Sequence, residues 1–319
     1  MITDREQLMY NIMGKISSSD APIVFKGAMI TQLILSEQGF DRVLRITKDV
    51  DSNWIGSPPS MDVLVDSIND SLGDLSDVCM AKGIRPYNDR QSAGISIVDR
   101  ATREQLFSMD ISVKPVVNSR TYYVGDVGIK GVLPSEVLAD KISVMSTDKI
   151  FSKTKHMLDV YALSHCVDVQ TKEIFGICHI KGERNNIEHF DAFYNRKSDL
   201  EHAYNMLKGV TGKPDFDTIH TYMTKFVQPF SSKDFVNKTW DSDTQGWVQE
   251  SRYLSHSREN ADLSAARNAD KEPIAIQNTM EGYMRDISAM RENDKGGDKG
   301  GDTVKNVNNG RNIKGKGDR

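Results

Sequence analysis

The 319-residue sequence has few cysteines and no long apolar run. Its three cysteines, Cys79, Cys166 and Cys178, do not form a disulfide framework of the kind found in small secreted domains. No apolar stretch approaches the roughly 20 residues that span a bilayer, so we expect no membrane insertion. The first residues also lack the pattern of a signal peptide. We therefore expect a cytoplasmic protein.

The sequence also has little net charge. Its 41 basic and 45 acidic residues give a formal charge of −4, which is no general signature of nucleic-acid binding. Any contact with RNA must therefore use a local basic patch. The length suffices for one large or two ordinary domains.

Two Cys–His pairs do not predict a metal centre. His165-Cys166 and Cys178-His179 lack the C-x₂₋₄-C spacing of a structural zinc site. No oxyanion-hole sequence accompanies them, as it would a cysteine nucleophile. We expect Cys166 to be a small buried apolar residue on its helix.

A pair of aspartates, Asp49 and Asp51, carries the strongest chemical signal. They end the segment Arg45-Ile-Thr-Lys-Asp-Val-Asp51, which is typical of a strand. Residues two apart on a strand share a face, about 6–7 Å apart at Cα. Magnesium takes oxygen ligands and prefers one or two carboxylates together with substrate phosphates. The pair predicts a site for Mg²⁺ carried in with a nucleotide, although D-x-D is also common in turns.

A third aspartate and a glycine turn extend this site. Asp110 lies in an alternating strand over 105–113, where a carboxylate calls for a partner or a metal. Its other interpretation is a satisfied polar residue at a strand end. The glycine turn at residues 26–28 precedes an expected helix over 29–37, whose first N–H groups can bind an anion.

Lys141 and Asp159 fall on two later expected helices, over 135–148 and 153–167. From its place on an apolar stripe, Lys141 is either a snorkelling surface residue or a cation that offsets charge on the leaving pyrophosphate. Asp159 could orient Lys141 or the acceptor, or simply pair with Lys155 at i, i+4.

Over about residues 20–230 these motifs resemble the AbiEii/AbiGii-type toxin nucleotidyltransferases of abortive phage infection and type IV toxin–antitoxin systems, which include the MenT toxins. The matching segments are Lys26-Gly27-Ala28-Met29, Arg45-Ile-Thr47-Lys-Asp49-Val-Asp51, Asp110, Leu138-Ala-Asp-Lys141-Ile and Lys155-His-Met-Leu-Asp159-Val-Tyr161. The sequence departs from the family pattern at Ala28, Met29 and His156, where the family has glycine, a hydroxyl residue and aspartate.

The resemblance implies a Mg²⁺-dependent enzyme that transfers NMP from an NTP to an acceptor, for which it suggests a tRNA 3′ end. Growth arrest would be the consequence, and a separately encoded antitoxin would be a partner. The implied catalytic residues are Asp49, Asp51, Asp110, Lys141 and Asp159, of which the first three would hold the metal. The implied nucleotide contacts are Lys26, Gly27, Ala28, Arg45 and Thr47.

Two alternatives stay open at this point. The same chemistry could modify a protein or a small molecule, which would need no RNA groove. The chain could also be a catalytically degenerate nucleotide-binding interaction module, because Ala28 and Met29 alter the glycine turn.

The order of expected elements predicts an α+β fold, with a nucleotidyltransferase-type mixed sheet and flanking helices followed by a helical bundle domain. Residues 1–125 would form the catalytic domain, with helices over 5–15 and 60–72 and strands over 95–99 and 120–125. Residues 126–232 would form a helical domain that completes the cleft, with further helices over 187–208 and 216–230.

The last part of the chain is less regular. Residues 233–290 form a polar segment of uncertain structure, with a short helix expected over 274–291. Residues 291–319 contain only three apolar side chains and cannot bury a core, so we expect a disordered basic tail.

Overall fold

The computed structural model describes residues 4–87, 92–182, 187, 189–234 and 237–249. The chain divides into two units, Met1–Ala265 and Ala266–Arg319, and every described residue lies in the first. The helix expected over 274–291 and the tail expected over 291–319 lie outside the described residues. Within the described part, no helix is long and apolar enough to cross a bilayer.

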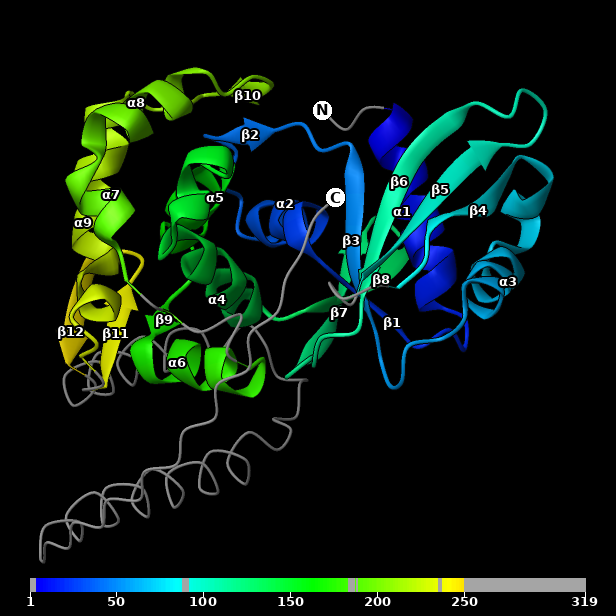
Figure 1. Ribbon diagram of the computed structural model, residues 1–319, viewed down its shortest axis with the longest axis horizontal. Coiled ribbons are helices and arrows are strands. Elements are labelled where there is room, and N and C mark those ends of the chain that lie inside the picture. The colour runs from blue at the N-terminus through cyan, green and yellow to red at the C-terminus, as the bar shows by residue number, and fades with distance from the viewer. Residues whose placement is uncertain (1–3, 88–91, 183–186, 188, 235–236, 250–319) are drawn as a thin grey trace, which may run out of the picture. The chain divides into compact units, whose positions relative to one another are not determined.

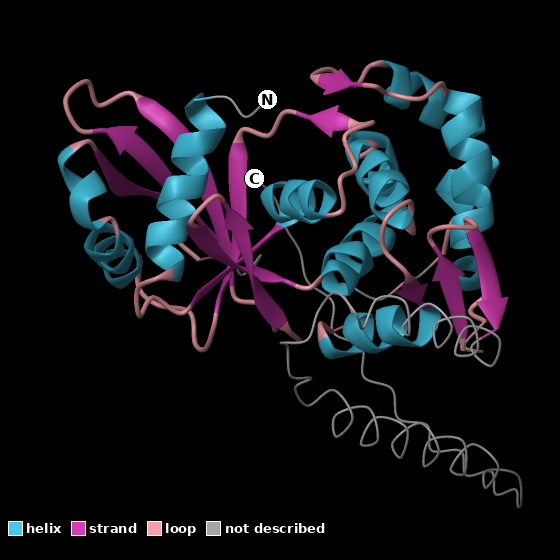
Figure 2. Ribbon diagram, turned by 180° about the vertical axis from the view of Figure 1, so that it is seen from behind, coloured by secondary structure: helices cyan, strands magenta, loops and turns pink. Residues whose placement is uncertain are grey.

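A seven-stranded mixed sheet forms the first half of the fold (Figures 1 and 2), in the order β4-β5-β6-β3-β1-β8-β7. The strands are β1 (Ile23–Lys26), β3 (Asp49–Trp54), β4 (Cys79–Arg85), β5 (Ser92–Asp99), β6 (Gln105–Ser112), β7 (Ser119–Val124) and β8 (Val127–Val132). The central strand β3 runs antiparallel to β1 and parallel to β6. The expected mixed sheet with flanking helices is confirmed.

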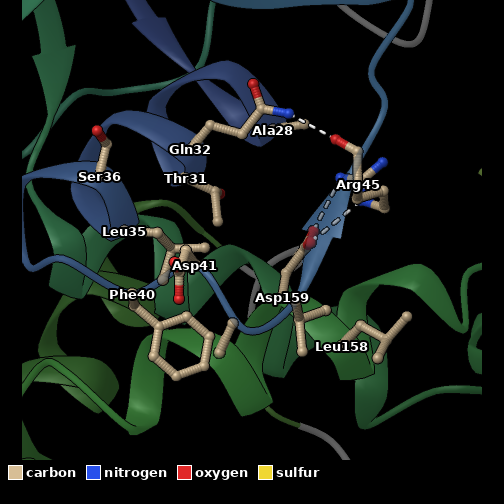
Figure 3. A pocket seen from close by; sticks show the side chains of 12 residues that line it. Ala28, Thr31, Gln32, Leu35, Ser36, Phe40, Asp41, Arg45, Leu158 and Asp159 are labelled. Atoms are coloured by element: carbon tan, nitrogen blue, oxygen red, sulfur yellow. Dashed lines mark hydrogen bonds and ion pairs between the residues drawn. The ribbon is translucent and has the colours of Figure 1, made fainter. Parts of the chain in front are cut away.

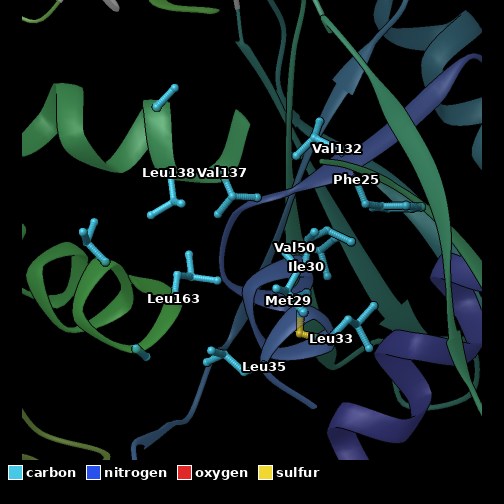
Figure 4. Packing of buried hydrophobic residues seen from close by; sticks show 14 of the residues in the cluster. Phe25, Met29, Ile30, Leu33, Leu35, Val50, Val132, Val137, Leu138 and Leu163 are labelled. Carbon is cyan, nitrogen blue, oxygen red and sulfur yellow. The ribbon is translucent and has the colours of Figure 1, made fainter. Parts of the chain in front are cut away.

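The core lies between this sheet and the helices that cover it, α1 (Asp4–Ser17), α2 (Gly27–Glu37) and α3 (Met61–Ser71). Met29, Ile30 and Leu33 of α2 are buried in one cluster with Phe25 and Val50 of the sheet (Figure 4). Because side chains alternate along a strand, the neighbours of Val50 on β3 point to the opposite face of the sheet. That face is the one that carries the aspartates.

Helices make up most of the second half. They are α4 (Pro134–Met145), α5 (Lys155–Ser164), α6 (Thr171–Ile180), α7 (Asp191–Asn195), α8 (Lys197–Asn205) and α9 (Phe216–Ser231), with short 3₁₀ helices η1 (Gly73–Asp77) in the first half and η2 (Asp148–Ser152) here. A small sheet of β9 (Val169–Gln170), β11 (Lys238–Asp241) and β12 (Gly246–Gln249) packs against α9 through the buried Trp240.

A second pair of strands joins the two halves. β2 (Leu44–Arg45) pairs with β10 (Val210–Thr211), so the loop that leads into β3 is tied to the connection between α8 and α9 (Figure 1). Through this pairing, the backbone of Arg45 lies directly opposite Val210.

Three sequence expectations need correction or completion. The single helix expected over 187–208 is wrong, because the chain breaks at Arg196, whose guanidinium packs over the Phe151 ring at 4.3 Å. The sheet continues past residue 125, since β8 pairs with both β7 and β1. The polar segment that begins at residue 233 contains the β11–β12 hairpin.

Candidate active site

One row of residues crosses five strands and defines the site. Asp51 lies directly opposite Lys26 on β1 and opposite Asp110 on β6. Beyond Asp110 the row continues through Gly94 on β5 to Arg85 on β4. Residues directly opposite one another share a face of the sheet. The fold thus places a cation at each end of a pair of carboxylates, and Asp49 shares their face two residues before Asp51.

The turn between β1 and α2 presses its backbone against Asp51. Gly27 has a φ of +71°, in the left-handed region that favours glycine. A Cβ at this position would lie 2.7 Å from the Asp51 Cβ and 2.8 Å from its carboxyl carbon. The turn therefore needs glycine for two reasons, its backbone conformation and the closeness of the carboxylate.

Burial and neighbouring charges act on the two aspartates of β3. Burial raises the pKa of Asp51, and the nearby Asp49 and Asp110 raise it further, while Lys26 and Lys141 lower it. Asp49 is held in place by Thr47, whose hydroxyl donates to Asp49 Oδ1 at 3.2 Å. The carboxylates are close enough to repel one another, which a cation bound between them would relieve.

Lys26 is a buried cation at the same place. Its Nζ donates to Asn53 Oδ1 at 2.8 Å and to Ser112 Oγ at 2.6 Å. Burial lowers its pKa, while the negative charges of Asp140 and Asp51 act in the opposite direction. The two hydrogen bonds draw the ammonium from β1 across β3 to Ser112, which ends β6, the strand of Asp110.

The first turn of α2 offers free backbone donors next to these carboxylates. Its N-cap residue, Lys26, makes no side-chain capping bond, and the first turn contains no acidic residue. Side-chain caps are present at α3 and α9, from Ser60 and Asp215, whereas α4, α5, α6, α7 and α8 share the uncapped start of α2. The N-terminus of a helix binds anions through its unpaired N–H groups and its dipole. An uncapped helix start beside Asp51 suits a phosphate.

Lys141, Asp159 and Arg45 form a buried triad behind this row. Lys141 Nζ donates to Asp159 Oδ2 at 2.6 Å. Arg45 donates to both oxygens of the same carboxylate, at 3.2 and 3.0 Å (Figure 3). Burial alone would raise the pKa of Asp159, but the two cations lower it to about 2. Asp159 therefore orients Lys141, which is one of the three roles that the sequence left open for it.

Two residues at the start of α5 complete the charged surroundings. Lys155 is half-buried, and burial together with Arg45 lowers its pKa while Asp49 and Asp51 raise it. The charges of both carboxylates therefore act on the Lys155 ammonium. His156 has its Nδ1 buried without a hydrogen-bond partner, and burial followed by the charge of Lys141 lowers its pKa to about 3. His156 is therefore a neutral residue in this site.

Asp110 has a partner that the sequence did not predict. Arg85 Nη2 lies 2.8 Å from Asp110 Oδ1, and both side chains are about half exposed, at 47% and 52%. Asp110 is therefore a half-exposed carboxylate that is paired with a cation. No signal in the sequence marked Arg85, because its strand, β4, was not expected.

The aspartates of β3 and β6 are the candidate ligands for a metal ion. Within the described residues, no group of three or more His, Cys, Asp or Glu side chains lies close enough to hold a metal ion. Asp49 and Asp51 still supply two carboxylates on one face, which is what Mg²⁺ needs when phosphates and water complete its shell. The pair fits a Mg²⁺ that arrives with a nucleotide.

A second buried ion network lies beside Lys26 and was also missed. Lys181 Nζ lies 3.0 Å from Glu136 Oε1 and 2.8 Å from Asp140 Oδ1, with its own side chain 1% exposed. The other Glu136 oxygen accepts from the backbone N–H groups of Val117 and Asn118. This network fixes α4 and α6 relative to the strand connection before β7, and it sets the charge that Lys26 faces.

A cavity of about 180 Å³ opens between α2 and α5 (Figure 3). Arg45 and Asp159 of the triad line it, as does Ala28 from the first turn of α2. The residues predicted to contact a nucleotide therefore lie in three places. Lys26 and Gly27 face Asp51, whereas Ala28 and Arg45 face this cavity. Thr47 donates to Asp49 and so positions its carboxylate.

No protein-family model and no curated protein matches the chain. Several solved structures resemble it, among them the following three. An antigenic nucleotidyltransferase-like protein from Paracoccidioides brasiliensis has 13% identity and a TM-score of 0.35, covering 50% of this chain and 75% of its own. The antibiotic-resistance factor ANT(2'')-Ia has 12% identity and a TM-score of 0.36, covering 65% and 100%. MenT4, a nucleotidyltransferase toxin from Mycobacterium tuberculosis H37Rv, has 14% identity and a TM-score of 0.40, covering 82% and 91%.

Proposed function

We propose that the protein is a Mg²⁺-dependent nucleotidyltransferase, which moves NMP from an NTP to an acceptor hydroxyl. The observation that carries this proposal is the packing of the Asp51 carboxylate against Gly27 at the uncapped start of α2, with Asp49 on the same face. The arrangement joins a site for a divalent cation to a site for phosphate. A nucleoside triphosphate with its Mg²⁺ needs both.

Each charged residue then has a distinct task. Asp49 and Asp51 would hold Mg²⁺, which supplies charge neutralisation between the phosphates. The first N–H groups of α2 would bind phosphate oxygens. Lys155 is placed to contact the phosphates directly. Lys141 is 4% exposed and bound to Asp159, so it acts on the site through its charge on Asp51.

The proposed reaction balances as a single displacement at the α-phosphate. The acceptor hydroxyl oxygen forms a bond to the α-phosphorus, and the bond to the β-phosphate oxygen breaks to release pyrophosphate. The hydroxyl proton passes to Asp110, after the guanidinium of Arg85 has moved off its carboxylate. The developing charge on pyrophosphate is offset by Lys155 and by the helix start.

For the acceptor we propose the 3′ end of tRNA, with a toxin role and an antitoxin as partner, as the resemblance of the motifs implies. Basic side chains around the proposed active site support an RNA acceptor. Arg85 and Lys48 are exposed beside the carboxylates, and Lys153 lies just before α5.

The test is incubation of the purified protein with Mg²⁺, each α-labelled NTP in turn and total tRNA. The double variant Asp49→Asn/Asp51→Asn removes both carboxylates of β3. Asp66→Asn/Asp70→Asn is the matched control, because it makes the same charge change on exposed residues of α3. We expect label on tRNA from the wild type and the control, and none from the Asp49/Asp51 variant.

The other outcomes separate the alternatives. Label on a protein or a small molecule would keep the chemistry and exclude the tRNA acceptor. Binding of Mg·NTP without transfer to any acceptor would identify a binding module. That module would be consistent with Met29, which stands at the family's hydroxyl position and is fully buried in the core.

A further inference from the structure

We propose that the cavity between α2 and α5 receives the base of the NTP, an inference that rests on the proposed function and specifies its substrate site. The cavity is lined by α2, by α5 and by the loop that joins α2 to β2 (Figure 3). Its volume of about 180 Å³ is below the roughly 300–1,000 Å³ of pockets that enclose whole drug-sized ligands. It therefore has room for one planar ring system and not for an entire nucleotide.

The walls of the cavity suit an aromatic ring. Its floor is made of buried apolar side chains, which are Leu35, Val43, Leu158 and Ala162. Phe40, partly buried, stands at the edge of the cavity in the loop after α2. A nucleobase gains from stacking on an aromatic ring and from covering apolar surface with its faces.

The rim offers polar groups for the edge of the base. Gln32 is held on both sides, because its Oε1 accepts from Tyr10 and its Nε2 donates to the Arg45 carbonyl at 2.6 Å. Asp41 is exposed at the opening, and a carboxylate only accepts hydrogen bonds. This carboxylate favours base edges that present N–H donors.

The cavity begins at Ala28, the residue after Gly27 of the proposed phosphate site. In the first turn of α2, Gly27 packs against Asp51, and Ala28, the next residue, lines the cavity. On the opposite wall, Arg45 and Asp159 line the cavity while Asp159 also holds Lys141. Phosphates at the helix start would leave the sugar beside Ala28 and direct the base toward Phe40.

The experiment measures the binding of two kinds of ligand by calorimetry in the presence of Mg²⁺. The first kind is the four NTPs, each measured separately. The second is inorganic tripolyphosphate, which has the phosphates and no base. Phe40→Ala removes the ring at the rim, and Ala162→Leu fills the floor. Tyr123→Ala is the control, because it removes a 65% exposed aromatic ring from β7.

We expect Phe40→Ala and Ala162→Leu to weaken NTP binding by about tenfold, the loss of roughly one stacked ring. Tripolyphosphate binding should be unchanged in both variants, and Tyr123→Ala should change neither ligand. Unchanged NTP binding in both variants would overturn the proposal, as would an equal loss for both ligands. If NTP binding is unchanged while tRNA binding, measured in parallel, is weakened, the cavity belongs to the acceptor and the proposal is overturned. If the wild type binds neither NTP nor tripolyphosphate, the proposed function itself fails.

Discussion

Gly27 packs directly against the side chain of Asp51, which leaves no room for a Cβ at residue 27. Glycine is required there because a Cβ would come within 2.7 Å of the Asp51 Cβ, at a backbone φ of +71°. The contact aligns the start of α2 with the aspartates of β3. The proposed phosphate site at the helix start and the proposed metal site at the aspartates therefore lie next to each other.

The first prediction concerns Gly27→Ala. Left-handed backbone at a non-glycine residue costs about 1–2 kcal/mol, and the new methyl group must also displace Asp51. We expect a larger loss of unfolding free energy than in Gly125→Ala, and a loss of Mg·NTP binding. Gly125 has a φ of +56° and no atom within 4 Å of the added Cβ, so its variant carries the backbone cost alone. Equal urea midpoints and equal binding for the two variants would contradict the contact.

The second prediction concerns Asp159 and acid. Its pKa is about 2 in the folded protein, below the ordinary 3.8, because Lys141 and Arg45 outweigh its burial. The unfolded state therefore binds the proton first as the pH falls. We expect this residue's contribution, about 2 kcal/mol, to be complete above pH 4 and lost as the pH falls toward 2.

The corresponding variant is Asp159→Asn, which leaves two cations unpaired. We expect it to lose about 3–5 kcal/mol at pH 7, as when one partner of a buried ion pair is removed. The double variant Lys141→Met/Asp159→Leu should recover part of this loss in urea denaturation. A double variant less stable than the single one would argue against the buried pair.

The third prediction concerns His156, whose pKa is lowered to about 3 by burial and by Lys141. Between pH 6.5 and 3 the unfolded state binds the proton more readily than the folded state. Stability should thus fall as the pH drops through this window, by at most about 1.4 kcal/mol per pH unit from this residue. His156→Gln should reduce the slope, and His202→Gln, on an exposed residue of α8, should not. An NMR titration of the His156 ring with a midpoint near 6.5 would refute the prediction.

The fourth prediction concerns Arg85, which competes with a metal for Asp110. Because the ion pair is half exposed, Arg85→Ala should change stability by less than about 1 kcal/mol. It should strengthen Mn²⁺ binding, as followed by electron paramagnetic resonance, since Asp110 becomes free to act as a ligand. Arg85→Lys keeps the charge and should remain near the wild type. Weaker Mn²⁺ binding in Arg85→Ala would show that the arginine supports the site.

The strand with Asp49 and Asp51 and the helices of the first half could be predicted from the sequence, because each is a short local segment and the two aspartates alternate about Val50. Strand β8 could not, since Gly128 and Gly131 interrupt its alternation. The structure gives a physical reason for Gly131, where a Cβ would lie 3.0 Å from the Tyr122 ring and closer than 3 Å to Ile30. Tight packing of α2 on the sheet thus removed the pattern that would have marked the strand.

The candidate site was predictable only where its residues are close in sequence. Thr47, Asp49 and Asp51 occupy one segment, and their spacing gave their shared face. The ion pair of Arg85 with Asp110 and those of Lys181 join residues from separate elements, and they form only when the fold brings these together. Charge pairs of this kind leave no periodic trace in a sequence.

Arg45 unites parts of the chain that are distant in sequence. Its backbone pairs with β10, its carbonyl accepts from α2, and its guanidinium holds α5. Recombination that exchanged the helical half alone would therefore replace two of these three partners at once. We therefore expect the two halves to be exchangeable only as a pair, and residue 45 to be replaceable only together with its partners.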